Sequence, residues 1–297
     1  MLPRTTLAAP TAELRGIGLF TGAPAAVRIA PAESGGIVFT RIDRPGTRWV
    51  PATIDHIVRD LSTVGFPAGM PVRNSVLASS DGAAVILTVE HILSALVGMG
   101  VTDAVIELDG PEVPIGDGSA QAFAELIGGA GTRSLGATIQ PFRPARPITV
   151  EDTRGGRIEI TPLTAADAHT TYEYRLDYGP DSPLQAHAAS WRTGRGGDSY
   201  QRSVAPARTF SLRAEAEAAR AAGLFRNFSP RDLLVIGDDG DPIENAWRMA
   251  DEPAMHKVLD LIGDLALIGR PLAAKVVATK SGHALAHEAC RAALAAE

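Results

Sequence analysis

Hydrophobic residues recur along this chain with two spacings, one typical of short strands and the other of amphipathic helices. Short apolar runs bounded by turn-forming residues predict strands at residues 27–29, 37–41, 104–108, 148–150, 158–160, 233–236 and 274–278. Apolar residues at helical spacing predict helices at residues 88–96, 119–127, 213–222, 255–268 and 283–294. Residues 128–136 are rich in glycine, which indicates a helix exit or a linker.

The order of these predicted elements occurs twice. In each half a helix that carries a histidine, His91 or His256, leads to a strand, a glycine-containing loop and a second helix. The separation of His91 from Gly118 differs by only one residue from the separation of His256 from Gly282. Such an order also arises by chance in chains of mixed helices and strands, but the shared spacing favours a duplicated unit.

We therefore predict an α+β fold, a two-domain sandwich of duplicated units, each a β-sheet with helices packed on one face. The first domain is expected at residues 1–137 and the second at residues 138–297, with an insertion in each. The insertion in the second domain, at residues 193–241, starts with a glycine-rich loop. An insertion of this kind is where substrate selectivity is added to a common scaffold.

Length and charge agree with a globular protein that binds small molecules. The 297 residues exceed what one hydrophobic core usually supports, which favours two domains. The 28 Lys and Arg residues against 34 Asp and Glu residues give a formal net charge of −6. This acidic balance argues against a nucleic-acid partner, which needs a basic surface, but it leaves room for a local cationic site that binds an anionic small molecule.

The single cysteine, Cys290, excludes an intramolecular disulfide and any cysteine-rich metal site. A reducing, cytoplasmic location is the simpler interpretation. Residues 1–10 lack the apolar core of a secretory signal, and no run of about 18 apolar residues predicts a membrane span. A metal ion would therefore have to be held by His, Asp and Glu.

The most informative local pattern is the predicted helix with His256, Asp260 and Asp264. These residues are spaced four apart, so they share one helix face. A His and an Asp one turn apart can converge on one cation, as two of the three protein ligands of a catalytic zinc do. The alternative is a solvated face on which His256 and Asp260 form a weak helix pair.

Two further segments place titratable groups at predicted helix starts. Glu90 and His91 are adjacent, so their side chains point about 100° apart and could line one cavity from two sides. Lys280 and His283 flank a glycine turn that could bind an anion, and His283 could pair with Asp264. Taken without the second half, helix capping is the preferred explanation of the first pair, and a simple glycine turn with a half-exposed histidine is the more common explanation of the second. The other histidines have no spaced partner and are expected on the surface: His56, His169, His187 and His287.

Five segments together resemble one known family. They are Thr88–His91, Pro114–Ala120, Ala207–Phe210, His256–Leu265 and Lys280–Ala284. In this order they resemble the UDP-3-O-acyl-N-acetylglucosamine deacetylases of lipid A biosynthesis (LpxC type), and the resemblance extends from Gly16–Gly22 to the last predicted helix. It implies a zinc-dependent hydrolase with an active site where the helical layers of two duplicated α+β units meet.

The resemblance implies a role for each matching residue. It makes His91, His256 and Asp260 the zinc ligands and Glu90 the base that activates water. Thr209 would help to stabilise the oxyanion. His283, oriented by Asp264, would assist the leaving amine. The implied substrate contacts are Lys257, Lys280 and Phe210.

Two segments depart from the family pattern and keep other functions open. Residues 223–229 include the bulky Phe225 and Phe228 where the family has a Gly-Gly-Ser segment, and residues 61–85 are longer than usual, with Gly65–Gly69 inside them. One alternative is a deacetylase of a different N-acetylated sugar. Another is a metal-containing binding protein without turnover, and a third is a purely structural His/Asp helix face.

Overall fold

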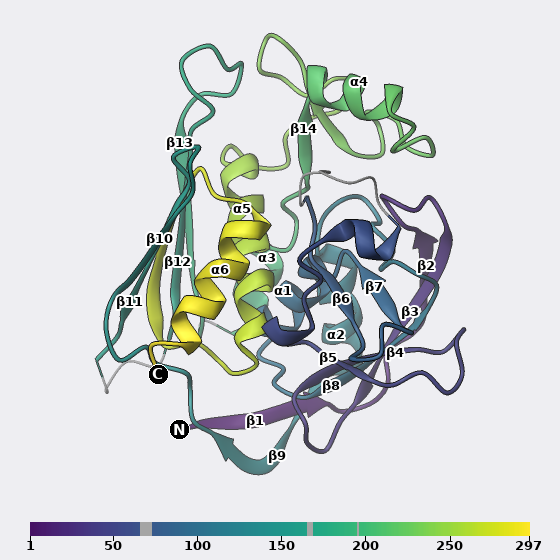
Figure 1. Cartoon of the computed structure of the whole chain (residues 1–297), viewed down its shortest axis with the longest axis vertical. Coiled ribbons are helices and arrows are strands. Elements are labelled where there is room, and N and C mark those ends of the chain that lie inside the picture. The colour runs from purple at the N-terminus through teal and green to yellow at the C-terminus, as the bar shows by residue number, and fades with distance from the viewer. Residues whose placement is uncertain (66–72, 165–168, 195) are drawn as a thin grey trace.

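The protein was analysed as a computed structural model that describes residues 1–65, 73–164, 169–194 and 196–297 (Figure 1). Two five-stranded sheets lie on opposite sides of a layer of helices. The part of residues 61–85 that departs from the family pattern most visibly, 66–69, lies outside the described residues.

The first five-stranded sheet has the order β2-β3-β8-β4-β5. Its strands are β2 (Leu14–Ile17), β3 (Pro24–Pro31), β4 (Ile37–Arg41), β5 (Val50–Pro51) and β8 (Ala104–Asp109). Only β4 and β8 pair in parallel; the other pairs are antiparallel. Ala104, Ile106 and Leu108 are buried whereas the residues between them are more exposed, because alternate side chains of a strand point to opposite faces.

The second five-stranded sheet repeats this topology in the order β10-β11-β16-β12-β13. Its strands are β10 (Ile148–Glu151), β11 (Arg157–Pro162), β12 (Thr171–Leu176), β13 (His187–Arg192) and β16 (Ala274–Thr279). Again one pair, β12 with β16, is parallel, and it occupies the same place in the order. The shared topology supports the predicted duplication of an α+β unit.

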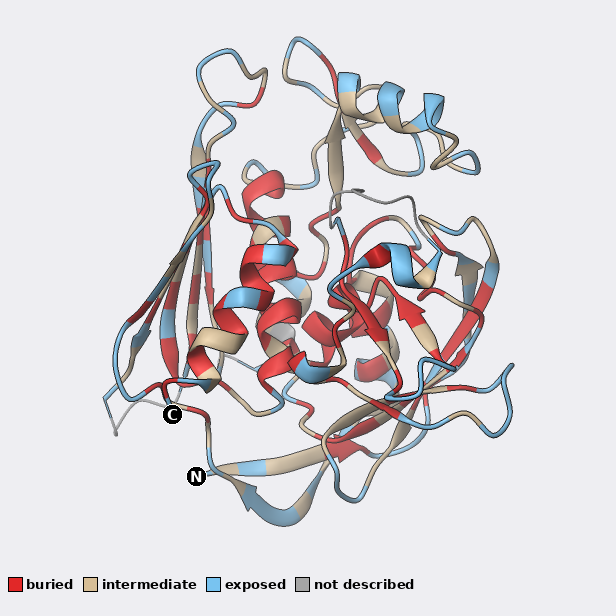
Figure 2. Cartoon of the chain, viewed as in Figure 1, coloured by how far each residue is buried: buried red, intermediate tan, exposed pale blue. Residues whose placement is uncertain are grey.

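Helices of both units lie between the sheets, and their facing sides are buried (Figure 2). The first unit supplies α1 (Glu90–Gly98) and α2 (Gln121–Ala130), and the second supplies α5 (Glu252–Leu265) and α6 (His283–Leu294). α1 packs directly on α5. Gly263 permits this contact, because a Cβ atom at that position would collide with the backbone carbonyl of Glu90.

Each unit carries an insertion, as predicted, and it lies before α1 in the first unit and before α5 in the second. In the first unit it contains the 3-10 helices η1 (Ile54–His56) and η2 (Leu61–Val64) and the hairpin of β6 (Val76–Ala78) and β7 (Val85–Leu87). In the second unit the insertion contains α3 (Gly197–Ser203), β14 (Phe210–Leu212), α4 (Arg213–Ala221) and β15 (Leu234–Ile236). The 3-10 helix η3 (Ala266–Ile268) lies outside the insertion and follows α5. α4 has no buried residue and projects from the molecule.

Residues 128–136 contain the helix exit that the glycines predicted, but they do not form a linker. α2 continues to Ala130, and β9 (Thr132–Ile139) pairs with β1 (Leu2–Leu7) as an antiparallel ribbon. The glycine content suggested a loop, and Gly131 and Gly136 do take a positive φ. The strand that pairs with β9, however, lies at the far end of the first unit's sequence. The domain limits 1–137 and 138–297 stay a prediction.

Candidate active site

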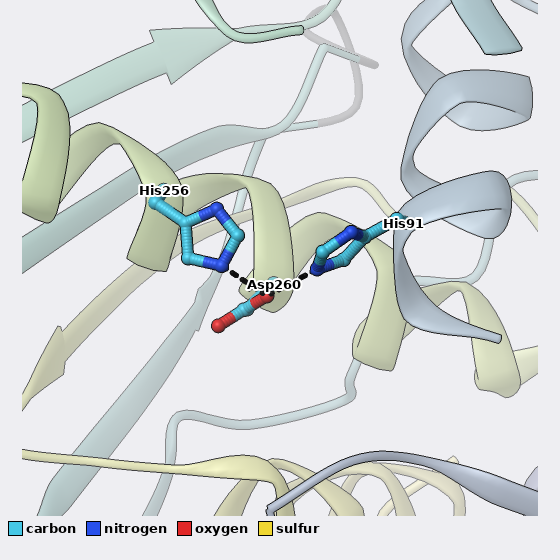
Figure 3. A group of neighbouring side chains, drawn as sticks. All are labelled: His91, His256 and Asp260. Carbon is cyan, nitrogen blue, oxygen red and sulfur yellow. Dashed lines mark ion pairs between the residues drawn. The ribbon is translucent and has the colours of Figure 1, made fainter. Parts of the chain in front are cut away.

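The packing of α1 on α5 brings three metal-ligating side chains together (Figure 3). His91 projects from α1, while His256 and Asp260 project from successive turns of α5, and all three are buried. Asp260 Oδ1 lies 3.3 Å from His256 Nε2 and 3.6 Å from His91 Nε2. One ligand atom from each residue lies within 4.8 Å of the other two.

This cluster has the donor set and the unmet bonding capacity that suit a divalent cation. Asp260 Oδ1 is buried and makes no hydrogen bond within the described part of the chain. His256 Nδ1 lies 3.1 Å from the carbonyl oxygen of Ala207, so Nδ1–H donates there and the lone pair of Nε2 faces Asp260. Two imidazoles and one carboxylate are the ligands of many catalytic metal sites. The three residues therefore could hold a metal ion.

The charge states of His256 and Asp260 agree with metal binding. Burial lowers the pKa of His256, which favours the neutral imidazole that ligates metals, although Asp260 partly opposes the shift. Burial alone would raise the pKa of Asp260, but its interactions with His256 and the charge of Lys257 hold it well below its usual value. Lys257 Nζ lies 3.0 Å from Asp260 Oδ2, which leaves Oδ1 turned toward the imidazoles.

Glu90 is a second buried carboxyl group beside the cluster, but its chemistry differs. Burial raises its pKa to about 7, because the charge of His283 offsets only part of the loss of water and the charges of Asp264 and Asp260 act in the same direction as burial. The backbone N–H of Ser75 donates to Glu90 Oε2 over 2.9 Å and fixes the side chain. A carboxyl group with this pKa can accept a proton near neutral pH.

His283, at the first position of α6, is held by Asp264 of α5. Its Nδ1 lies 2.8 Å from Asp264 Oδ2, and its Nε2 lies 4.0 Å from Asp260 Oδ2. Burial works against protonation of His283, but the charge of Asp264 and the hydrogen bond to it outweigh burial and raise the pKa to about 10. The protonated imidazole therefore predominates at neutral pH.

A cavity of about 960 Å³ opens over these groups. It is large enough for an extended small molecule. Nine of the ten residues that the sequence pointed to line it: Glu90, His91, Thr209, Phe210, His256, Lys257, Asp260, Lys280 and His283. Asp264, the tenth, lies behind His283, where it can act on that imidazole.

Comparison of the chain with known proteins shows the family to which it belongs. A family model described as LpxC, UDP-3-O-acyl N-acetylglycosamine deacetylase, matches residues 4–295. The chain belongs to this deacetylase family.

Several similar relatives carry the name UDP-3-O-acyl-N-acetylglucosamine deacetylase. The relative from Anaeromyxobacter sp. (strain Fw109-5) is 38% identical over 273 residues, which cover 91% of this chain and 82% of the relative. The relative from Solibacter usitatus is 36% identical, with 95% and 88% covered. The Chlamydia pneumoniae relative is 34% identical, with 90% and 89% covered.

In this deacetylase family member, Thr209 is placed by a loop of the other unit. Gly118 accepts a hydrogen bond through its carbonyl from Thr209 N at 2.7 Å. Gly118 has φ +83°, and a Cβ there would lie only 2.9 Å from Thr209 Cγ2. Behind Thr209, the buried Arg208 donates to Glu252 over 2.7 Å, which fixes the segment against α5.

The expected substrate-binding residues lie at the wall of the cavity. Lys257 Nζ sits 5.7 Å from the centre of the Phe210 ring, within the range of a cation–π contact. Lys280 forms an ion pair with Asp177 at 2.9 Å and has a left-handed backbone, with φ +49°. Their common place in the cavity agrees with the expectation, and their contacts with substrate stay a prediction.

Two buried residues near the deacetylase site were missed by sequence reasoning. His287 was expected on the surface, but it is buried, and its Nε2 lies 2.8 Å from Ser75 Oγ. Its position one turn after His283 was the available signal, because residues four apart share a helix face. Ser75 precedes the hairpin of β6 and β7 and carries no local pattern. His169 is exposed, and His56 and His187 are partly exposed.

None of the helices in the described part of the chain combines the length and the apolar composition that crossing a bilayer requires. In the segment Pro114–Ala120, Asp117 accepts hydrogen bonds from the backbone N–H and the hydroxyl of Ser119.

Proposed function

We propose that this protein is a zinc-dependent hydrolase that removes the N-acetyl group of UDP-3-O-acyl-N-acetylglucosamine and releases acetate, a step of lipid A biosynthesis. The observation that carries the proposal is the cluster of His91, His256 and Asp260 in one cavity with Glu90 and His283. The membership of the deacetylase family supports the same reaction. Two imidazoles and one carboxylate beside an open cavity are a ligand set that catalytic zinc sites use.

The metal ligands and the acid–base pair have separate tasks in this proposal. When bound, zinc supplies Lewis acidity that polarises an amide carbonyl and makes water more acidic. Glu90 accepts a proton from the attacking water, because its pKa of about 7 leaves much of it ionised near neutral pH. His283 is protonated at that pH and donates its proton to the leaving amine.

The remaining predicted residues bind and orient the substrate. The hydroxyl of Thr209 can donate a hydrogen bond to the oxyanion that forms when water adds to the amide. Lys257 and Lys280 supply positive charge to the cavity for the phosphates of a nucleotide sugar, and Phe210 supplies an aromatic surface beside them. Local cations thus serve an anionic substrate on a protein whose net charge is −6.

A cytoplasmic location is part of the proposal. Nucleotide sugars are soluble small molecules, and Cys290 is a buried free thiol that suits a reducing compartment. No nucleic-acid partner is proposed, because the acidic balance offers no basic footprint.

The first test measures acetate release and bound zinc together. Purified wild-type protein should contain zinc and release acetate from the UDP-linked acylated sugar. His256→Ala and Asp260→Ala should each lose the metal and lower kcat by about 10³-fold or more, because the remaining donors cannot hold zinc tightly. His187→Ala, which removes a histidine from the surface of β13, is the matched control and should retain both. An active variant without zinc would contradict the proposal.

The contact between Phe225 and Phe20 favours a second candidate substrate, a sugar without a long acyl chain. Phe225 packs edge-to-face on Phe20 with ring centres 5.6 Å apart, and both line the cavity, so two aromatic rings from different units narrow it. A deacetylase of a sugar without a long acyl chain would suit this narrowing. Comparing kcat/KM for acylated and unacylated UDP-N-acetylglucosamine separates the two: a preference for the acylated sugar supports the leading proposal, and acetate release from either excludes a silent binding protein.

A further inference from the structure

Ser75 links the two groups of the proposed acid–base pair, although it does not line the cavity. It is completely buried in the segment before β6. Its backbone N–H donates to Glu90 Oε2 over 2.9 Å, and its hydroxyl donates to Asp264 Oδ1 over 2.6 Å. Asp264 is the carboxylate that holds His283. One residue of the first unit therefore contacts both the base and the support of the acid.

The direction of each hydrogen bond follows from the chemistry of the groups. The Asp264 carboxylate can only accept, so the single hydroxyl proton of Ser75 points to it. The Ser75 oxygen then accepts from His287 Nε2–H, 2.8 Å away. Burial lowers the pKa of His287 to about 4, so the ring is neutral and donates from Nε2. The chain of donors runs from His287 through Ser75 to Asp264.

This chain fixes both oxygens of Asp264. Oδ2 accepts from His283 Nδ1 at 2.8 Å, and Oδ1 accepts from Ser75 at 2.6 Å. With two bonds of different direction, the carboxylate cannot turn about its last bond without losing one of them. The plane of Asp264 then determines the direction in which the His283 ring faces the cavity.

We propose that Ser75 is a positioning residue that sets Glu90 and His283 in place together, and that His287 holds its hydroxyl in the active direction. The inference rests on the proposed hydrolysis, in which Glu90 and His283 transfer the two protons. It assigns a catalytic purpose to a buried histidine and a buried serine that contact neither the metal cluster nor the cavity.

The test separates the hydroxyl from the backbone bond. Ser75→Ala keeps the N–H that holds Glu90 but removes the donor to Asp264. We expect kcat to fall about 10- to 100-fold, because a misaligned proton donor loses part of the proximity advantage. KM should change less than about twofold and zinc content not at all, because Ser75 touches neither substrate nor ligands. Ser75→Thr, which restores the hydroxyl, should recover most of the lost kcat.

Two further variants show whether the effect travels through Asp264. Adding Ser75→Ala to an Asp264→Asn background should lower kcat by less than about threefold, because residues that act as one unit are not additive. Ser79→Ala is the matched control: it removes another buried hydroxyl of the same hairpin region, one that donates to Asp81, and kcat should stay unchanged.

If Ser75→Ala does not fold, His287→Leu tests the same chain, and its kcat should fall while KM holds. The proposal is overturned if Ser75→Ala keeps full kcat or raises only KM, or if Ser75→Thr fails to restore kcat. It is also overturned if Ser75→Ala lowers kcat as much in the Asp264→Asn background as in the wild type. A wild type that contains zinc but releases no acetate overturns the hydrolysis itself. The two failures are therefore distinct.

Discussion

Glu90 and Asp260 show how neighbours decide the chemistry of a buried carboxyl group. Both are almost completely buried, so both lose the solvation that favours ionisation. The pKa of Glu90 rises to about 7, whereas His256 and Lys257 reverse the effect of burial on Asp260 and keep it ionised. One carboxyl group is thereby suited to proton transfer and the other to metal binding.

These pKa shifts predict a bell-shaped dependence of kcat/KM on pH. Glu90 must be deprotonated to act as a base, so activity should increase as pH rises through about 7. His283 must be protonated to act as an acid, so activity should decrease as pH rises through about 10. Initial rates across this range, with zinc content and circular dichroism followed as controls, test the profile. An acidic limb near 4.5, the ordinary pKa of a glutamate, would contradict the role assigned to buried Glu90.

At the scale of single residues, spacing along helices predicted more than any other signal. His256, Asp260 and Asp264 could be placed on one face because residues four apart share a face whatever the fold. Their meeting with His91 and Glu90 required a resemblance to a known family, since nothing in the periodicity joins two distant helices. Ser75 could not be found, because its importance lies in hydrogen bonds to residues far away in the sequence.

At the scale of elements, the contact between α1 and α5 depends on the absence of one side chain. A Cβ at position 263 would overlap the Glu90 carbonyl, so Gly263→Ala must push the helices apart. We expect a loss of about 1–3 kcal/mol in the free energy of unfolding from overpacking. We also expect a fall in kcat and zinc affinity, because His91 and Glu90 move with α1. Urea unfolding and zinc titration measure both effects.

Gly129→Ala is the matched control for this helix substitution. Gly129 lies in α2, has an ordinary helical φ, and a Cβ there would meet no atom within 4 Å. Removing glycine from a helix then stabilises it by about 0.5–1 kcal/mol, with no change in activity. If Gly263→Ala is as harmless as Gly129→Ala, the close helix contact does not position the site.

The elements themselves were predicted unequally well. α6 and β4 have the bounds that the sequence predicted, and α1, α5 and β8 begin or end within a few residues of them, because local periodicity determines them. β9 was missed because Gly131 before it and Gly136 within it suggested a break in regular structure, and because its pairing with β1 is non-local. Propensity within a segment carries no information about such a distant partner.

At the scale of the whole molecule, the three residues that could hold a metal ion come from both duplicated units. His91 belongs to the first and His256 and Asp260 to the second, so a bound ion binds only the assembled native state. Such a ligand stabilises the native state by about 2.7 kcal/mol when its free concentration is 100 times Kd. Removing zinc with a chelator should therefore lower the midpoint of thermal unfolding, and adding zinc back should restore it.

The specificity of this effect is tested with His256→Ala. Its midpoint of unfolding should respond to neither chelator nor zinc, whereas His187→Ala should respond as the wild type does. Equal zinc-dependent shifts in the wild type and His256→Ala would show that the ion stabilises the protein from another place.

The missing side chain at position 263 also limits how the two halves can be recombined between relatives. Glu90 and His91 sit on a helix whose position depends on a glycine in the other half. A chimera that joins the first half of this chain to the second half of a relative should retain activity only when the donor half brings glycine to that place. A substitution at position 263 in one half therefore acts on the site residues of the other half.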